Sequence, residues 1–121
     1  MITLDYADRR PIYEQVVDKI KDLILLGVLE TDSQLPSVRE LAMDLSINPN
    51  TVQRAYAELE RQNVIYCVKG RGNFVAGIST LKEQHKEEMK TQLSELVKMA
   101  KKADITESEF IELAKQYYSQ Q

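Results

Sequence analysis

Residues 35–60 read LPSVRELAMDLSINPNTVQRAYAELE and contain two helix starts separated by one short turn. Ser37, with Glu40 three residues later, has the spacing of a capping box, in which both side chains accept hydrogen bonds from free backbone N–H groups. Asn48 can cap a second helix, and Pro49 suits the first helical position because its φ angle is already helical. Two short helices joined by about four residues are typical of a helix-turn-helix.

Apolar residues at helical spacing predict three helices around one core. The first helix begins at Pro11, which is expected at its first position, and stops at Gly27. The apolar stripes of the three helices are Ile12, Tyr13, Val16, Val17, Ile20, Leu23 and Ile24; Val38, Leu41, Ala42 and Leu45; and Val52, Ala55, Tyr56 and Leu59.

After these helices the periodicity changes to that of strands. Residues 64–68 (VIYCV) and 73–76 (NFVA) flank Lys69-Gly70-Arg71-Gly72, whose glycines suit a tight hairpin turn. Three helices followed by a hairpin are the layout of a winged helix-turn-helix. The sequence therefore predicts a mainly α fold with a small β-wing.

Two smaller expectations concern this domain, which we assign to residues 1–77. Residues 2–6 alternate briefly and are expected to form a short edge strand. Cys67 is expected in the core, because its strand neighbours are apolar.

Residues 78–121 form a second part of the chain, rich in Lys, Glu and Gln. We expect a long helix with one apolar side, followed by a shorter amphipathic helix that begins at the capping pair Thr106 and Glu109. One short partner helix cannot cover the long stripe, so a second copy of the chain is expected to bury it. Packing against residues 12–24 is the alternative. The expected dimerisation residues are Leu81, Met89, Leu93, Leu96, Val97 and Ala100.

Composition excludes several classes of protein. Lys and Arg number 16 against 19 Asp and Glu, which excludes a polybasic coat that binds nucleic acid without regard to sequence. One cysteine and one histidine exclude a disulfide framework and multi-cysteine zinc sites. No nucleophile–base pair or phosphate loop is recognisable, so we expect neither an enzyme nor a cofactor. The apolar run 23–29 is too short to span a bilayer and no signal core is visible, which indicates a cytoplasmic protein without membrane association.

The helix expected after Asn48 carries the residues that suit base recognition. Wheel geometry points Asn50 and Arg54 away from the core and places Thr51 and Gln53 on the flanks. Asn, Gln and Arg make bidentate contacts to base edges in the major groove, and Thr adds hydroxyl or methyl contacts. A plain solvated helix face is the alternative interpretation.

Two further sites offer cations beside backbone N–H groups or glycines. Arg39 lies in the first turn of its helix beside Ser37, which suits a phosphate, although an ion pair with Glu40 or Asp44 is the alternative. The segment 69–72 places two cations on a turn of little bulk and suits a groove or backbone contact, or is a plain surface turn. Residues 36–72 hold five basic and four acidic side chains, so net charge is a weak signal. The stronger signal for DNA binding is that the three sites lie on one predicted surface.

The blocks PIYEQVVDKI (11–20), the quoted residues 35–60 and KGRGNFVAG (69–77) together resemble the DNA-binding domain of the GntR family of bacterial transcriptional regulators. The resemblance implies a winged helix-turn-helix that binds a palindromic operator as a dimer and usually represses transcription. Many members have arginine at the positions of Pro49 and Gln53, so operator preference is expected to differ. The DNA contacts that the resemblance implies fall on Ser37, Arg39, Asn48, Asn50, Thr51, Gln53 or Arg54, Gly70 and Arg71, beside the wing residue Lys69.

The short region after residue 77 has room for two helices only, which resembles the YtrA subfamily. That resemblance implies an adjacent transporter operon as the regulated target and leaves open a small-molecule effector of unknown identity. A winged-helix module that binds a protein is the alternative function, because the local charge is only +1, but the cluster of Asn, Thr, Gln and Arg argues for DNA.

Overall fold

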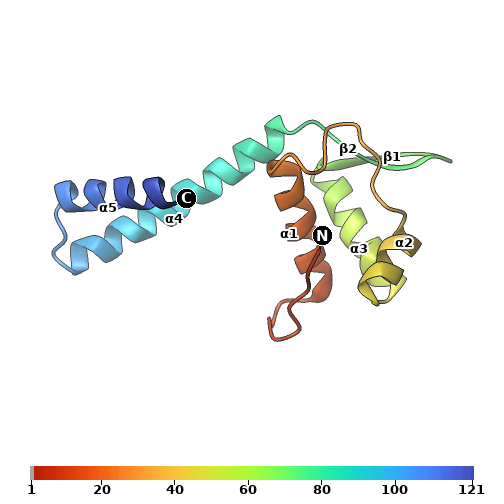
Figure 1. The fold of residues 1–121 in the computed structure, drawn as a ribbon, viewed down its shortest axis with the longest axis horizontal. Coiled ribbons are helices and arrows are strands. Elements are labelled where there is room, and N and C mark those ends of the chain that lie inside the picture. Colours follow the sequence, from red (N-terminus) through yellow and green to blue (C-terminus); the bar gives the residue numbers. More distant parts are fainter. Residues whose placement is uncertain (1) are drawn as a thin grey trace. The chain divides into compact units, whose positions relative to one another are not determined.

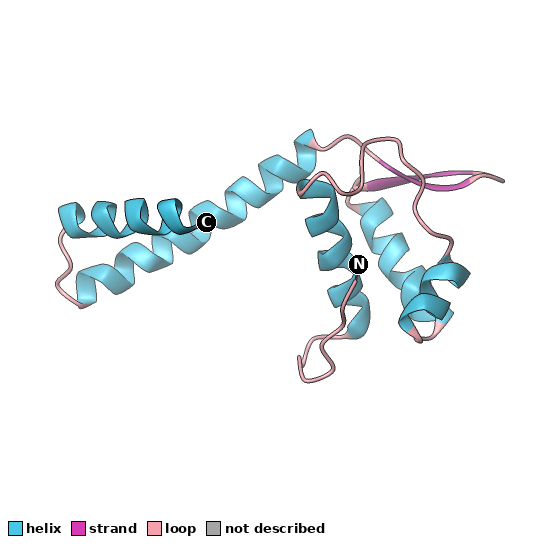
Figure 2. Ribbon diagram, in the orientation of Figure 1, coloured by secondary structure: helices cyan, strands magenta, loops and turns pink. Residues whose placement is uncertain are grey.

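The computed structural model describes residues 2–121, which form five helices and one two-stranded sheet (Figures 1 and 2). The mainly α fold with a small β-wing is confirmed. The elements are α1 (Ile12–Leu25), α2 (Val38–Leu45), α3 (Pro49–Arg61), β1 (Ile65–Val68), β2 (Gly72–Val75), α4 (Ser79–Lys102) and α5 (Glu107–Gln120).

The ends of α1 follow from a proline and a glycine. Pro11 is the N-cap rather than the first helical residue, and its carbonyl accepts hydrogen bonds from the backbone N–H groups of Glu14 (3.1 Å) and Gln15 (3.4 Å). The expected position was therefore one residue too far into the helix. Gly27 has a φ of 79° just after the C-cap, a conformation that glycine adopts without steric cost.

The helix-turn-helix has the two caps expected from the sequence. Ser37 Oγ accepts from the Glu40 N–H at 3.1 Å and the Glu40 carboxylate accepts from the Ser37 N–H, which completes the capping box of α2. Asn48 Oδ1 accepts from the Asn50 N–H at 2.8 Å, and Pro49 is the first residue of α3.

The apolar stripes of α1, α2 and α3 meet in one core that the hairpin closes. Tyr56 is buried in this core and donates its hydroxyl to the carbonyl of Pro36 at 2.7 Å. Burial, reinforced by the negative charge of Glu40, raises the pKa of the Tyr56 hydroxyl, so this donor keeps its proton at neutral pH. The bond joins α3 to the residues that lead into α2. The buried apolar residues are Val16, Val17, Ile20, Ile24, Leu35, Leu41, Ala42, Val52, Ala55, Tyr56, Leu59, Val64, Ile65, Val75 and Leu81.

The hairpin is antiparallel, with Ile65 opposite Val75 and Val68 opposite Gly72. Ile65 and Val75 are buried at the base, whereas the rest of β1 is exposed. The expectation for Cys67 was therefore wrong: the cysteine is exposed, because the hairpin extends beyond the helices that form the core.

Two features near the sheet differ from the expectation. Residues 2–6 form no strand; instead Gln15, buried in α1, accepts the Asp5 N–H and donates to the Asp5 carbonyl, both at 2.9 Å. A side-chain amide thus takes the place of a strand partner. A third extended segment lies where none was expected, because Gln34 pairs antiparallel with Phe74.

The chain divides into two compact units, Met1–Glu83 and Gln84–Gln121. The division follows Glu83 rather than Gly77, because the first turn of α4 contributes Leu81 to the core of the first unit, where it is only 5% exposed. Leu81 is therefore covered within its own chain, contrary to its expected place in a dimer seam.

In the second unit, α4 turns into α5 through Asp104, which has a φ of 57°. Thr106 and Glu109 form the expected capping box of α5. Ala100 is only 7% exposed beside this turn, where the Ile105 N–H donates to its carbonyl at 3.0 Å. Ala100 is therefore also covered within its own chain, whereas no residue of α5 is buried.

Candidate nucleic-acid interface

The start of α2 presents one free cation beside a cap. Ser37 uses its side-chain oxygen on the Glu40 N–H, so what remains for a ligand is its hydroxyl proton. Arg39, two residues into the helix, is exposed. Within residues 2–121 it forms no ion pair with Glu40 or Asp44, which removes that alternative. A guanidinium in the first turn of a helix suits a phosphate oxygen.

The polar side chains at the start of α3 differ in whether the helix cap already uses one of their hydrogen-bonding groups. Asn48 has its carbonyl oxygen engaged as a cap, which leaves its amide N–H groups for a ligand. Asn50 and Gln53 are exposed, while Thr51 is half-buried. Asn50 and Gln53 therefore keep the donor and acceptor that a bidentate contact to a base edge requires.

Arg54 does not extend freely from α3. Its guanidinium lies over the ring of Tyr13 in α1, with Cζ 3.9 Å from the ring centroid. This cation–π contact holds the side chain against the beginning of α1, although the residue as a whole stays exposed. Tyr13 therefore belongs to the surroundings of the site. Its apolar ring at helical spacing had indicated a core residue, and the sequence carried no signal that α1 approaches Arg54.

The tip of the wing presents two more cations. Lys69, Gly70 and Arg71 are exposed between the strands. The Arg71 N–H donates to the Val68 carbonyl at 2.9 Å, and Gly70 adopts a φ of 79° that this turn requires. Gln34, just before α2, donates its side-chain amide to the Arg71 carbonyl at 2.7 Å. The segment that leads into α2 therefore contacts the wing tip.

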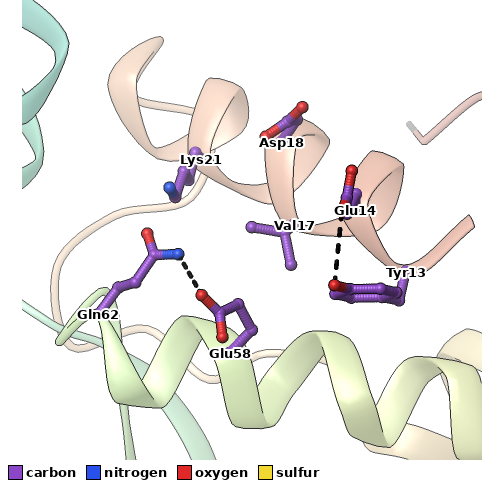
Figure 3. Close-up of a pocket in the computed structure, with 7 residues that line it drawn as sticks. All are labelled: Tyr13, Glu14, Val17, Asp18, Lys21, Glu58 and Gln62. Carbon is purple, nitrogen blue, oxygen red and sulfur yellow. Dashed lines mark hydrogen bonds between the residues drawn. The ribbon is translucent and has the colours of Figure 1, made fainter. Parts of the chain in front are cut away.

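Arg61, the last residue of α3, is engaged elsewhere. Its Nε donates to Glu58 Oε2 at 2.9 Å. Gln62 also donates to Glu58, with Nε2 2.7 Å from Oε1, as Figure 3 shows. These hydrogen bonds, first from Arg61 and then from Gln62, lower the pKa of Glu58 to about 2. The charge of Arg61 is balanced by Glu58, so Arg61 is less available to a ligand than the side chains in the first two turns of α3.

A polar hollow lies between α1 and α3 (Figure 3). Its lining holds the carboxylates of Glu14, Asp18 and Glu58 but only one cation, Lys21. This charge disfavours a phosphate. Within residues 2–121 no group of three or more His, Cys, Asp or Glu side chains is placed to hold a metal ion. Among the same residues, the helices are all too short or too polar to cross a bilayer.

Comparison with known proteins agrees with this arrangement. Residues 12–75 match the bacterial regulatory proteins of the gntR family. The HTH-type transcriptional repressor YtrA of Bacillus subtilis is 42% identical over 99 residues, which are 80% of this chain and 76% of that protein. The crystal structure of a transcriptional regulator from Oenococcus oeni has a TM-score of 0.81 at 34% identity, and the match covers 98% of this chain and 99% of that one.

A solved complex shows a similar fold on DNA. AraR(DBD) in complex with operator ORE1 has a TM-score of 0.55 and 30% identity, covering 63% of this chain and 93% of that one. The similarity to YtrA reaches beyond the winged domain, because 99 aligned residues exceed the 83 residues of the first unit. The relatives are transcriptional regulators rather than enzymes, and none of them favours a module that binds only protein. The chain therefore belongs to the gntR family of bacterial regulatory proteins and is a DNA-binding transcriptional regulator similar to YtrA.

Proposed function

We propose that this regulator acts as a homodimeric repressor that binds a palindromic operator, with residues 78–121 as its dimerisation region. The observation that carries the proposal is an exposed apolar stripe on α4. Its four residues are between 36% and 50% exposed although all are large and apolar. They are Met89, Leu93, Leu96 and Val97.

This stripe has the spacing of a helix seam, with intervals of four, three and one residues. Leu81 and Ala100 are left out of the proposed seam because both are buried within their own chain. On α5, Leu113 and Tyr117 are exposed as well, so both helices offer apolar area to a partner. A second copy of the chain supplies an equal stripe, and a two-fold axis lets the same patch cover itself.

We assign the DNA contacts by the chemistry that each side chain has free. Arg39, Lys69 and Arg71 are exposed cations and are proposed to bind phosphates, which position the protein without reading sequence. Asn50 and Gln53 are proposed to read base edges. Further DNA contacts are proposed for Ser37, Asn48, Gly70 and the half-buried Thr51. The stacked Arg54 is proposed to contact the backbone beside α1 rather than a base, because Tyr13 already holds its guanidinium.

The regulated genes are proposed from family resemblance to form an adjacent transporter operon. The same resemblance leaves open a small-molecule effector of unknown identity.

Selection from a random DNA library tests the proposal with the full chain. The enriched sequences are expected to contain an inverted repeat, and sedimentation of the complex is expected to show two chains per duplex. A single unrepeated half-site bound by one chain would contradict the homodimer. A reporter placed behind the enriched sequence then tests repression, and activation of that reporter would contradict the repressor role.

A further inference from the structure

The segment before α2 runs antiparallel along the free edge of β2 and forms an isolated bridge with it, between Gln34 and Phe74. The Asp32 N–H donates to the Val75 carbonyl at 2.8 Å, and the Val75 N–H donates to the Ser33 carbonyl at 2.9 Å. The Leu35 N–H then donates to the Asn73 carbonyl at 2.8 Å. This ladder connects the wing to the residues that lead into the helix-turn-helix.

The ladder stops where the wing tip begins. Alternate carbonyls face the same edge of a strand, so the next acceptor after Asn73 is the carbonyl of Arg71, the residue just before β2. The backbone donor two residues beyond Leu35 is the Ser37 N–H, but the capping box of α2 directs that group to the Glu40 carboxylate at 3.4 Å. The side chain of Gln34 supplies the missing donor, with Nε2 2.7 Å from the Arg71 carbonyl oxygen.

The neighbouring glycine leaves room for this amide. A Cβ atom on Gly72 would lie 2.9 Å from Gln34 Nε2, closer than van der Waals contact allows. Gly72 also has a φ of 125°, which side-chain-bearing residues rarely adopt. The Gln34 side chain therefore occupies the space that a side chain at position 72 would need.

We propose that Gln34 is a positioning residue for DNA binding. Its amide ties the wing tip to the segment that leads into α2, so that Lys69 and Arg71 reach the same DNA backbone as Arg39. A two-stranded hairpin is marginally stable by itself, and its exposed tip needs such a tie to keep one orientation. The inference rests on the wing contacts of the proposed function.

The test is a double-mutant cycle on the full chain, with a duplex selected by that chain from a random library. Gln34→Met keeps the side-chain length but removes the donor. We expect it to weaken binding about 3-fold to 10-fold, the usual effect of one hydrogen bond. Thr31→Ala, at an exposed position just before the same segment, is the matched control and should bind as the wild type does.

The cycle combines Gln34→Met with the wing variant Lys69→Ala/Arg71→Ala. If Gln34 acts by positioning these cations, Gln34→Met should cause little further loss once they are absent. The same loss in both backgrounds would overturn the inference, because Gln34 would then act independently of the wing. Unchanged binding of Gln34→Met, with a clear loss in the wing variant, would overturn it as well.

Nuclear magnetic resonance gives a readout that general destabilisation does not move. In Gln34→Met the heteronuclear NOE values of the Gly70 and Gly72 amides should fall, while those of α3 stay unchanged. A lowered midpoint with uniform NOE values would indicate a structural role only and overturn the inference. Failure of the selection to enrich any duplex would instead count against the proposed function itself, so the two failures are distinguishable.

Discussion

Each unit of the chain begins one helix with a capping box, but the two units bury their side chains very differently. Ser37 with Glu40 and Thr106 with Glu109 form complete capping boxes, one in each unit. The N-terminal unit places three helix stripes and the base of the hairpin around one continuous core. In the C-terminal unit, α5 has no buried residue and the stripe of α4 is exposed. The start of a helix thus depends on residues close by in the sequence, whereas burial of its side chains depends on which other element packs against it.

This difference predicts two kinds of stability. Most helical stability in proteins comes from packing of an apolar face rather than from caps or propensity. The N-terminal unit has its packing partners in the same chain and is expected to fold alone. The C-terminal unit is expected to reach full stability only when another chain covers α4, which makes its stability depend on protein concentration.

The largest expected effect comes from ending the chain after Glu83. The remaining protein should be folded and monomeric, because it keeps every member of the N-terminal core. Operator affinity should fall at least about 100-fold, since two linked half-site interactions become one. Circular dichroism measures folding, sedimentation measures mass, and a gel shift measures affinity.

A second truncation, after Gly77, serves as the control for the position of the boundary. It also removes Leu81, so the free energy of unfolding should fall by about 2–5 kcal/mol relative to the longer fragment. Equal stability of the two fragments would place Leu81 outside the core. A fragment 1–83 that remains dimeric would place the dimer contact in the winged domain.

Much of the fold could be predicted because its signals are local. The capping boxes, the apolar stripes and the glycines of the hairpin each depend on residues within about one or two turns of one another. The pairing of the segment at Gln34 with β2 could not be predicted, since its partners lie some 40 residues away and the segment has no alternating pattern. Leu81 was assigned to the seam because its helix continues into the next unit, although its first turn packs in the core.

The next effect compares one leucine from each unit. Leu59 is fully buried in α3, so Leu59→Ala should lower the free energy of unfolding by about 2–5 kcal/mol at any protein concentration. Leu93→Ala should leave the stability of the monomer nearly unchanged and weaken self-association. Urea unfolding at several concentrations separates the two cases. Destabilisation of dilute, monomeric protein by Leu93→Ala would show that Leu93 packs within its own chain.

A smaller effect distinguishes two positions of the proposed DNA surface. Asn50→Ala should cost about 1–3 kcal/mol on the operator and relax specificity at one position per half-site, because Asn50 has a free amide for a base edge. Arg39→Ala should weaken operator and random DNA alike and reduce the salt slope by about one, since a phosphate contact carries no sequence information. The measurement is binding to both duplexes over a range of salt. Loss on the operator alone for Arg39→Ala would assign Arg39 to a base.

Interactions between elements limited the prediction of this site. A helical wheel gives the direction of Arg54 relative to its own helix, but it does not show that Tyr13 of α1 lies in that direction. Arg61 differs from Arg54, because its partner Glu58 lies three residues away in the same helix. The sequence could predict which side chains lie on the surface. Only the structure shows which of them are already engaged by other residues of the chain.

The smallest expected effect is a pH dependence confined to the N-terminal unit. The pKa of Glu58 is lowered from 4.5 to about 2 by hydrogen bonds from Arg61 and Gln62. A carboxyl whose folded pKa lies below its unfolded pKa stabilises the fold above the unfolded value. That contribution is lost as the pH falls through the folded value, so the window runs from about pH 4.5 down to about pH 2. Thermal midpoints of fragment 1–83 over this window should therefore fall less steeply for Glu58→Gln than for the wild type.

The matched control lies in the other unit. Glu95 pairs with Lys98 at 3.1 Å with the same three-residue spacing, and both side chains are about two-thirds exposed. An exposed ion pair without a second donor contributes little to stability. Glu95→Gln in the full chain should therefore leave the decrease of the thermal midpoint at acid pH unchanged. The Glu58 carboxylate differs because Gln62 donates to it as well and because its side chain is less exposed. If the thermal midpoints of Glu58→Gln and the wild type fall equally at acid pH, these hydrogen bonds to Glu58 persist in the unfolded chain or do not form in solution.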